Sequence, residues 1–351
     1  MPVRRGSSIP LTLCGISLGL IAMVASSAFA QATPGQLARG IVFDLPSPLA
    51  RNSVLLQRLL TPRQRESQLA AMAVKGKALA PYPLDLSTER FSIYLPKQEP
   101  PAGYGLLVFI PPWDDARLPL GWSQVLERER VIFVAAERSG NDEDIVGRRI
   151  PLALTAANAL AERYRVDPKR IFISGFSGGS RVAFRIAMAY TDVFAGVLLD
   201  SGSDPVGTPY NPLPSPELML LLQNRTRFVF VTGENDEINL SRDADARISL
   251  SAWCVNATRA IVRPRVGHEI MDGNGFAEAL RALARLSPSD PAQHRRCLAS
   301  MDARLQQART LAATLSAQSP SAKVKEQLDR LDREYGALLD TGTAHATPAP
   351  D

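Results

Sequence analysis

The sequence predicts an α/β protein whose mostly parallel sheet carries helices on both faces. From residue 90 onward, short apolar segments alternate with helical stretches such as 151–164 and 180–190. Buried parallel strands have this continuous apolar character, and helices form the connections between them. Apolar residues make up 45% of the 351 residues, which is enough for a full-sized core. Sheets of this class place their functional sites at the carboxyl ends of the strands.

The first 30 residues have the pattern of a secretory signal peptide. Arg4 and Arg5 precede an apolar run from Ile9 to about Val24, and residues 28–30 (Ala-Phe-Ala) form a small-x-small cleavage pattern. We expect residues 1–30 to be cleaved and the mature chain to be periplasmic or secreted, with no membrane span. An uncleaved membrane anchor is the alternative.

The mature chain is nearly balanced in charge. Loss of Arg4 and Arg5 with the signal segment lowers the formal charge from +5 to +3. Basic residues are interleaved with acidic ones, and no basic stripe carries aromatic residues. Nucleic acid is therefore not an expected partner.

Residues 31–89 are predicted to form an N-terminal helical accessory region. Ser47-Pro48 and Thr61-Pro62 each place a hydroxyl cap before a proline at the first helical position. Gln64 stands where a capping box requires it. These helices carry no residues suited to catalysis, so we expect them to pack.

An α/β domain is expected over residues 90–297. Its strands are predicted from short apolar runs bounded by turn residues. These runs are 91–95, 106–110, 131–135, 171–174, 197–199, 228–231 and 260–263.

Residues 298–340 are predicted to form a helical hairpin. Leu298, Met301 and Leu305 begin an apolar pattern with spacings of three and four that breaks at Ser319-Pro320 and resumes at Val324. The hairpin is expected to fold back on the α/β domain, with self-association as the alternative. Residues 341–351 are small and polar, and we expect a disordered tail.

Two cysteines remain in the predicted mature chain, Cys254 and Cys297. In an oxidising compartment they are expected to form a disulfide, and two buried free thiols are the alternative. No Cys-x-x-Cys pair or histidine-rich tract is present, so we expect no metal site and no cofactor.

The stretch Ile171 to Ser180 carries the strongest chemical signal. An apolar strand leads into Gly175-Phe176-Ser177-Gly178-Gly179 and then into a helix, which is the context of a nucleophile elbow. Glycines two positions to either side of Ser177 allow strand and helix to approach closely. The N–H of Gly178, at the start of that helix, is a candidate oxyanion donor.

A serine nucleophile needs a base, and the sequence has three histidines. His294 lies among polar residues before the C-terminal helices, and His345 lies in the tail. His268 directly follows the last predicted strand. It is therefore the expected base, with a structural loop histidine as the alternative.

The base in turn needs a carboxylate that orients it. Asp236 follows the strand 228–231 and the turn at Gly233, and it is the preferred candidate. Glu234, Glu237 and, at greater distance, Asp243 are its rivals.

A second oxyanion donor is expected in the loop after the strand 106–110. Pro111 and Pro112 have no N–H, so Trp113 is the first residue that can donate. Its indole could also line the substrate pocket or simply pack. The acidic loop 141–144 lacks the spacing of a calcium loop and is interpreted as solvated.

The run Val166 to Gly179 resembles the α/β-hydrolase superfamily, especially its polyhydroxybutyrate depolymerase and feruloyl esterase-like branch. The resemblance spans about residues 90–286 and implies Ser177 as nucleophile, Asp236 as acid and His268 as base. Many of these esterases carry His-Gly after the third strand, where this chain has Pro111-Pro112-Trp113.

These observations predict an exported serine hydrolase that cleaves small-molecule or polymeric esters through an acyl-enzyme. A serine peptidase of the prolyl oligopeptidase type is the nearest alternative, because the same groups attack amides. A catalytically silent scaffold that binds a partner is the other.

Overall fold

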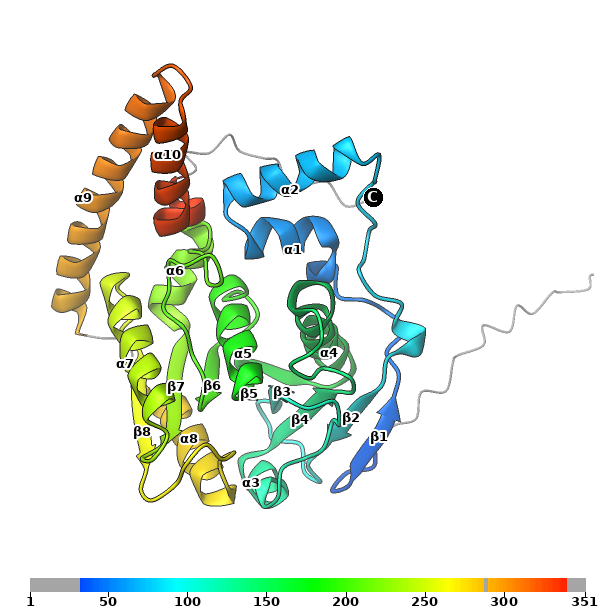
Figure 1. Cartoon of the computed structure of the whole chain (residues 1–351). Coiled ribbons are helices and arrows are strands. Elements are labelled where there is room, and N and C mark those ends of the chain that lie inside the picture. The colour runs from blue at the N-terminus through cyan, green and yellow to red at the C-terminus, as the bar shows by residue number, and fades with distance from the viewer. Residues whose placement is uncertain (1–31, 287–289, 340–351) are drawn as a thin grey trace, which may run out of the picture. The chain divides into compact units, whose positions relative to one another are not determined.

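The computed structural model describes residues 32–286 and 290–339 (Figure 1). The predicted signal segment and the predicted tail lie outside these residues. Within the two described ranges, no helix has both the length and the apolar character that crossing a membrane requires.

One eight-stranded sheet forms the centre of the described chain, with the strand order β1-β2-β4-β3-β5-β6-β7-β8. All pairs from β4 through β3 to β8 are parallel, whereas β1 and β2 run antiparallel to their neighbours. The mostly parallel sheet predicted from the sequence is thus confirmed. The strands are β1 (Leu37–Ile41), β2 (Phe91–Tyr94), β3 (Tyr104–Ile110), β4 (Val131–Ala136), β5 (Val166–Phe176), β6 (Gly196–Asp200), β7 (Arg227–Gly233) and β8 (Thr258–Arg263).

The edge strand β1 corrects the prediction of a helical accessory region over residues 31–89, because this region also supplies a strand of the sheet. It pairs with β2 through Leu37 opposite Tyr94 and Ala38 opposite Ile93. Of its five residues only Ile41 is buried, so the segment lacks the apolar run that marks the other strands. The boundary expected at residues 89 and 90 therefore falls between two paired strands of one sheet, and the described residues belong to one compact unit.

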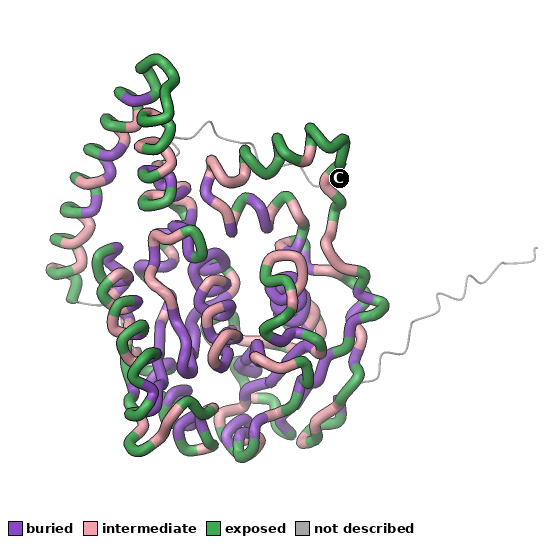
Figure 2. Tube along the Cα trace, viewed as in Figure 1, coloured by how far each residue is buried: buried purple, intermediate pink, exposed green. Residues whose placement is uncertain are grey.

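Two apolar clusters cover the two faces of the sheet, as the alternation along β3 shows. Leu106, Val108 and Ile110 belong to one cluster, and Leu107 and Phe109 to the other. Strands β2, β3, β4, β6 and β7 are among the most buried segments in Figure 2. The first face carries α1 (Asn52–Leu59), α4 (Ile150–Arg163), α5 (Gly178–Ala189), α6 (Pro216–Arg225) and α7 (Glu237–Ala252), and the second carries α3 (Trp122–Glu129) and α8 (Gly273–Arg285).

Helix α2 (Pro62–Val74) begins with the predicted capping box between Thr61 and Gln64. The predicted C-terminal hairpin is also present, formed by α9 (Pro291–Ser316) and α10 (Ala322–Tyr335) (Figure 1). Helix α9 begins earlier than expected because Asp290 caps its first turn.

The hairpin packs on the rest of the chain, as the first of its two sequence interpretations expected. Met301 and Leu305 of α9 join the main apolar cluster. The Asp332 carboxylate of α10 accepts a hydrogen bond from the Thr61 hydroxyl at the start of α2. A disulfide between Cys254 and Cys297, expected from the sequence, links the end of α7 to α9.

Candidate active site

Ser177 occupies a strained turn between β5 and α5. Its φ is 55° and its ψ is −119°, in a region that residues with a side chain rarely adopt. The tightness of the turn explains the flanking glycines. A Cβ at Gly175 would lie 2.3 Å from the Gly179 carbonyl carbon, and a Cβ at Gly179 would lie 2.0 Å from the Ile110 oxygen. The turn therefore raises the Ser177 hydroxyl at the carboxyl end of the sheet.

His268 lies in the connection between β8 and α8. Its Nε2 atom is 2.9 Å from Ser177 Oγ, and its Nδ1 atom is 2.7 Å from Asp236 Oδ2. The imidazole lies beside the ring of Phe176, with 5.0 Å between the ring centroids. One face of the imidazole is thus supported by the residue that precedes the serine.

Asp236 stands at the N-cap position of α7, after β7, and it is buried. Asn239 Nδ2 donates to both of its carboxylate oxygens, each at 2.9 Å. Burial raises the pKa of Asp236, but hydrogen bonds from His268 and Asn239 outweigh burial and hold that pKa below its usual value. The carboxylate is therefore kept charged against the imidazole.

The three rival carboxylates have other surroundings. Glu234 accepts the backbone N–H of Arg265 at 2.8 Å, and Glu237 is exposed on α7. Asp243 accepts the Ser203 and Thr232 hydroxyls, each at 2.5 Å, and burial raises its pKa to about 6.

A serine after β5, an aspartate after β7 and a histidine after β8 thus meet at one edge of an eight-stranded sheet with antiparallel β1 and β2. The chain has the α/β-hydrolase fold. The strand order and the strained turn at Ser177 are the basis for assigning this fold.

Several solved structures are similar to the chain. A thermostable esterase matches with 16% identity and a TM-score of 0.41, over 57% of this chain and 60% of its own. The acetyl xylan esterase from Aspergillus awamori matches with 14% identity and a TM-score of 0.44, over 56% of this chain and 94% of its own. Dipeptidyl peptidase 4 from Porphyromonas gingivalis matches with 13% identity and a TM-score of 0.43, over 56% of this chain and 33% of its own. No family model and no curated protein matches the sequence.

Two loops lie beside Gly178 at the candidate site, one containing Pro112 and Trp113 and the other containing Asn141. The Asn141 N–H donates to the Pro112 carbonyl at 3.1 Å and joins them. The Asn141 amide lies directly against Gly178, where a Cβ would be 2.2 Å from Asn141 Oδ1. The Trp113 ring lies 6.1 Å from the Phe176 ring, with the Arg117 guanidinium 4.1 Å from its centroid. Trp113 thus packs its indole beside the site.

Three residues around the candidate site were given no role from the sequence: Asn239, Asn141 and Arg149. Asn239 carried a weak signal, since it stands three positions after Asp236 in the first turn of a helix. Asn141 belongs to the acidic loop that was interpreted as solvated. In that loop Glu143 pairs with Arg148 at 3.2 Å, and Asp144 accepts the Gly147 N–H. Asn141, Asp142 and Asp144 are exposed, as the interpretation of this loop as solvated expected.

A cavity of about 380 Å³ adjoins the candidate site, and Gly178 and Asn141 belong to its lining. A larger one, of about 740 Å³, lies between α2 and α10 and is lined by no residue of the candidate site. The described residues contain no group of three histidine, cysteine or acidic side chains arranged to hold a metal ion.

Proposed function

We propose that this chain is an exported serine hydrolase that cleaves carboxylic esters, with Ser177 as nucleophile, His268 as base and Asp236 as the orienting acid. The observation that carries the proposal is the pair of contacts made by one imidazole, 2.9 Å to Ser177 Oγ and 2.7 Å to Asp236 Oδ2. A nucleophile, a base and an orienting acid within hydrogen-bond distance are the arrangement that activates a serine hydroxyl.

In the first step His268 Nε2 takes the Ser177 proton while Oγ attacks the ester carbonyl carbon. Asp236 accepts the hydrogen bond from Nδ1–H and stabilises the imidazolium. His268 then gives its proton to the leaving alcohol, which leaves an acyl group on Ser177. A water molecule then gives a proton to His268 while its oxygen attacks the acyl carbon. The bond to Ser177 Oγ breaks, His268 returns the proton to Oγ, and the acid is released.

The developing oxyanion is proposed to be held by the backbone N–H groups of Gly178 and Trp113. Gly178 is the first residue of α5, so its N–H has no acceptor within the helix and lies at the positive end of the helix dipole. The loop that contains Trp113 is held in place, because Arg149 Nη2 donates to the Pro111 carbonyl at 2.9 Å. Each such donor typically accounts for about 2.7 to 4 kcal/mol of transition-state stabilisation.

Export is proposed from the signal-like residues 1–30, and the disulfide between Cys254 and Cys297 is typical of an oxidising compartment. N-terminal sequencing of the exported protein tests it. A mature chain that begins at Gln31 is the expected result, and a retained Met1 would contradict it.

A fluorophosphonate probe tests the nucleophile. It should label the mature protein and a Ser241→Ala control, whose serine is exposed on α7, but not Ser177→Ala. Equal labelling of Ser177→Ala, or no labelling of the parent protein, would refute the proposal. Parallel panels of esters and peptide amides then test the ester preference, and faster amide cleavage would assign a peptidase instead.

A further inference from the structure

The cavity beside Gly178 is rich in positive charge. Its lining includes four arginines, Arg149, Arg181, Arg185 and Arg242, and one carboxylate among the described lining residues, Asp204. The cavity holds about 380 Å³ and contains apolar side chains as well. It therefore has room for a short hydrocarbon chain that ends in a charged group.

Arg149 is the most buried of these arginines, with 2% of its surface exposed. Its Nη2 atom donates to the Pro111 carbonyl at 2.9 Å, and its Nε atom has no hydrogen-bond partner among the described residues. No carboxylate of the described chain lies within ion-pair distance of it. A buried guanidinium without an ion pair is costly, because its charge has lost water and gained no anion.

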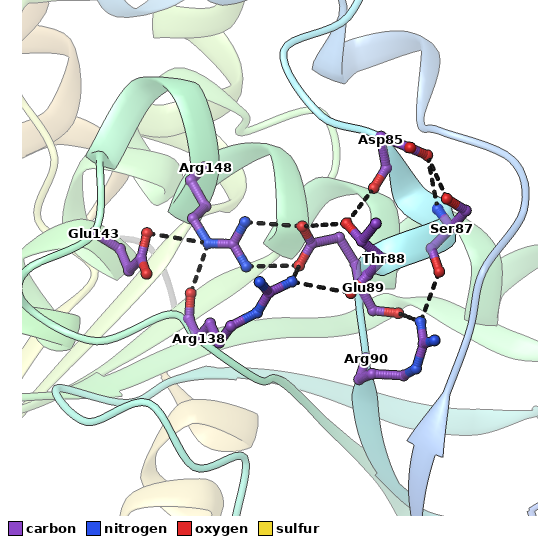
Figure 3. A network of polar contacts seen from close by, with 8 residues as sticks. All are labelled: Asp85, Ser87, Thr88, Glu89, Arg90, Arg138, Glu143 and Arg148. Atoms are coloured by element: carbon purple, nitrogen blue, oxygen red, sulfur yellow. Dashed lines mark hydrogen bonds and ion pairs between the residues drawn. The ribbon is translucent and has the colours of Figure 1, made fainter.

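The neighbouring arginine, Arg148, has a guanidinium that is paired with carboxylates. Arg148 donates to both carboxylate oxygens of Glu89, at 2.8 and 2.6 Å, and its Nε atom is 3.2 Å from Glu143 (Figure 3). Arg149 is more deeply buried and yet has no such partner. The contrast lies within one π-helical turn, Ile145–Arg149, a form that is frequent at functional sites.

The two carboxylates whose charges act on Arg149, Asp114 and Glu143, already have other partners. Asp114 accepts the Gly140 N–H at 3.1 Å, and Glu143 pairs with Arg148. Burial lowers the pKa of Arg149 to about 10, and the charges of Asp114 and Glu143 offset that effect only in part. The guanidinium thus stays charged at neutral pH while lacking a contact with an anion.

The other arginines are only partly neutralised. Arg181 lies 3.6 Å from Asp204 and donates to Asn239 Oδ1 at 3.2 Å, while Arg185 donates to the Leu59 carbonyl at 2.8 Å. The cavity beside the nucleophile therefore has an excess of positive charge.

We propose that this cavity binds a free carboxylate group of the substrate, with Arg149 as its main partner. The inference rests on the proposed function and narrows it to esters that carry a second, ionised carboxyl group. A carboxylate can accept two parallel hydrogen bonds from a guanidinium, which would satisfy the unpartnered Nε–H. Gly178 belongs both to the proposed oxyanion hole and to this lining, so the anionic end and the ester group would lie in adjoining spaces.

Two matched pairs of esters test the proposal. The acyl pair is mono-4-nitrophenyl adipate and 4-nitrophenyl hexanoate, which differ by a carboxylate in place of a methyl group. The alcohol pair is 4-carboxyphenyl butyrate and 4-methylphenyl butyrate. In at least one pair, kcat/KM for the charged ester should exceed that for the neutral one by roughly 10- to 100-fold, the value of a charge-assisted hydrogen bond in a buried site.

Arg149→Gln should reduce that ratio to about one, whereas Arg295→Gln, an exposed position on α9, should leave it unchanged. Because Arg149 also holds the Pro111 carbonyl, the readout is the ratio within a pair and not the absolute rate. Arg242→Gln, at an exposed position of the lining, provides a second variant and should lower the ratio roughly two- to fivefold.

The outcomes separate the two proposals. Ser177-dependent hydrolysis without preference for a charged ester, or a preference that survives Arg149→Gln, refutes the carboxylate site and leaves the hydrolase standing. Absence of Ser177-dependent hydrolysis refutes the proposed function. In that case calorimetric titration with adipate still tests the carboxylate site. Binding of adipate that Arg149→Gln does not weaken would overturn the site, and so would tighter binding of inorganic phosphate than of adipate.

Discussion

Asp236→Asn tests most directly how the proposed catalytic groups act. In the structure Asn239 Nδ2 donates to both oxygens of residue 236, and His268 Nδ1 lies 2.7 Å from one of them. An asparagine at position 236 would turn its carbonyl oxygen toward the Asn239 donor and its amide nitrogen toward His268. His268 would then carry its proton on Nε2, where it cannot accept the Ser177 proton.

We expect Asp236→Asn to lower kcat by roughly 10³- to 10⁴-fold at neutral pH. The assay is hydrolysis of a soluble 4-nitrophenyl ester, with the rate of fluorophosphonate labelling as a second measurement, because labelling needs the same base. Circular dichroism and urea unfolding establish that the variant is folded. A kcat within tenfold of the parent would refute the assignment of Asp236 as the orienting acid.

The double variant Asp236→Asn with Asn239→Asp gives this test a matched control. It moves the carboxylate to position 239, whose side-chain nitrogen lies 3.2 Å from His268 Nδ1 in the structure. Arg181, which donates to Asn239 Oδ1 at 3.2 Å, would stabilise the new charge. We expect the double variant to recover at least tenfold of the lost kcat, since a carboxylate again faces Nδ1–H. A double variant no faster than Asp236→Asn alone would contradict this reasoning.

Three further predictions follow from other contacts. Gly179→Ala should destabilise the fold by roughly 1–3 kcal/mol and slow ester hydrolysis, because its Cβ would meet the Ile110 oxygen at 2.0 Å; unchanged urea unfolding and kcat would contradict this. Cys297→Ser should cost about 4 kcal/mol of unfolding free energy, since the disulfide with Cys254 spans 43 positions, and urea midpoints unaltered by the substitution would show that the bond contributes little. Burial raises the pKa of Asp200 to about 8 from the usual 3.8, so the stability contributed by its protonated form is lost as pH rises from about 4 to 8. Asp200→Asn should remove that loss and unfold less readily than the parent near pH 8, whereas parallel stability curves over this range would exclude the effect.

Local chemistry made much of the fold predictable from the sequence. The buried strands are continuous apolar runs, so their positions could be read without knowledge of their neighbours. The glycine pattern around Ser177 could be recognised within a few consecutive residues, although Gly179 is tight against Ile110 of another strand. His268 could be chosen because only three histidines exist and one follows the last strand. Strand β1 escaped prediction because an exposed edge strand needs no apolar run.

By itself, then, the sequence determined the class of fold, the glycine-flanked turn at Ser177 and the candidate base, since each follows from side-chain periodicity or from the residue types of one short segment. Tertiary structure decided which of four nearby carboxylates faces His268, because that depends on where helix α7 begins relative to a loop 32 residues further along the chain. It also decided that Arg148 has carboxylate partners while Arg149 has none among the described residues. Whether a charged side chain is paired depends on contacts between segments that are distant in the sequence. Two adjacent arginines can therefore differ completely in their ion pairs.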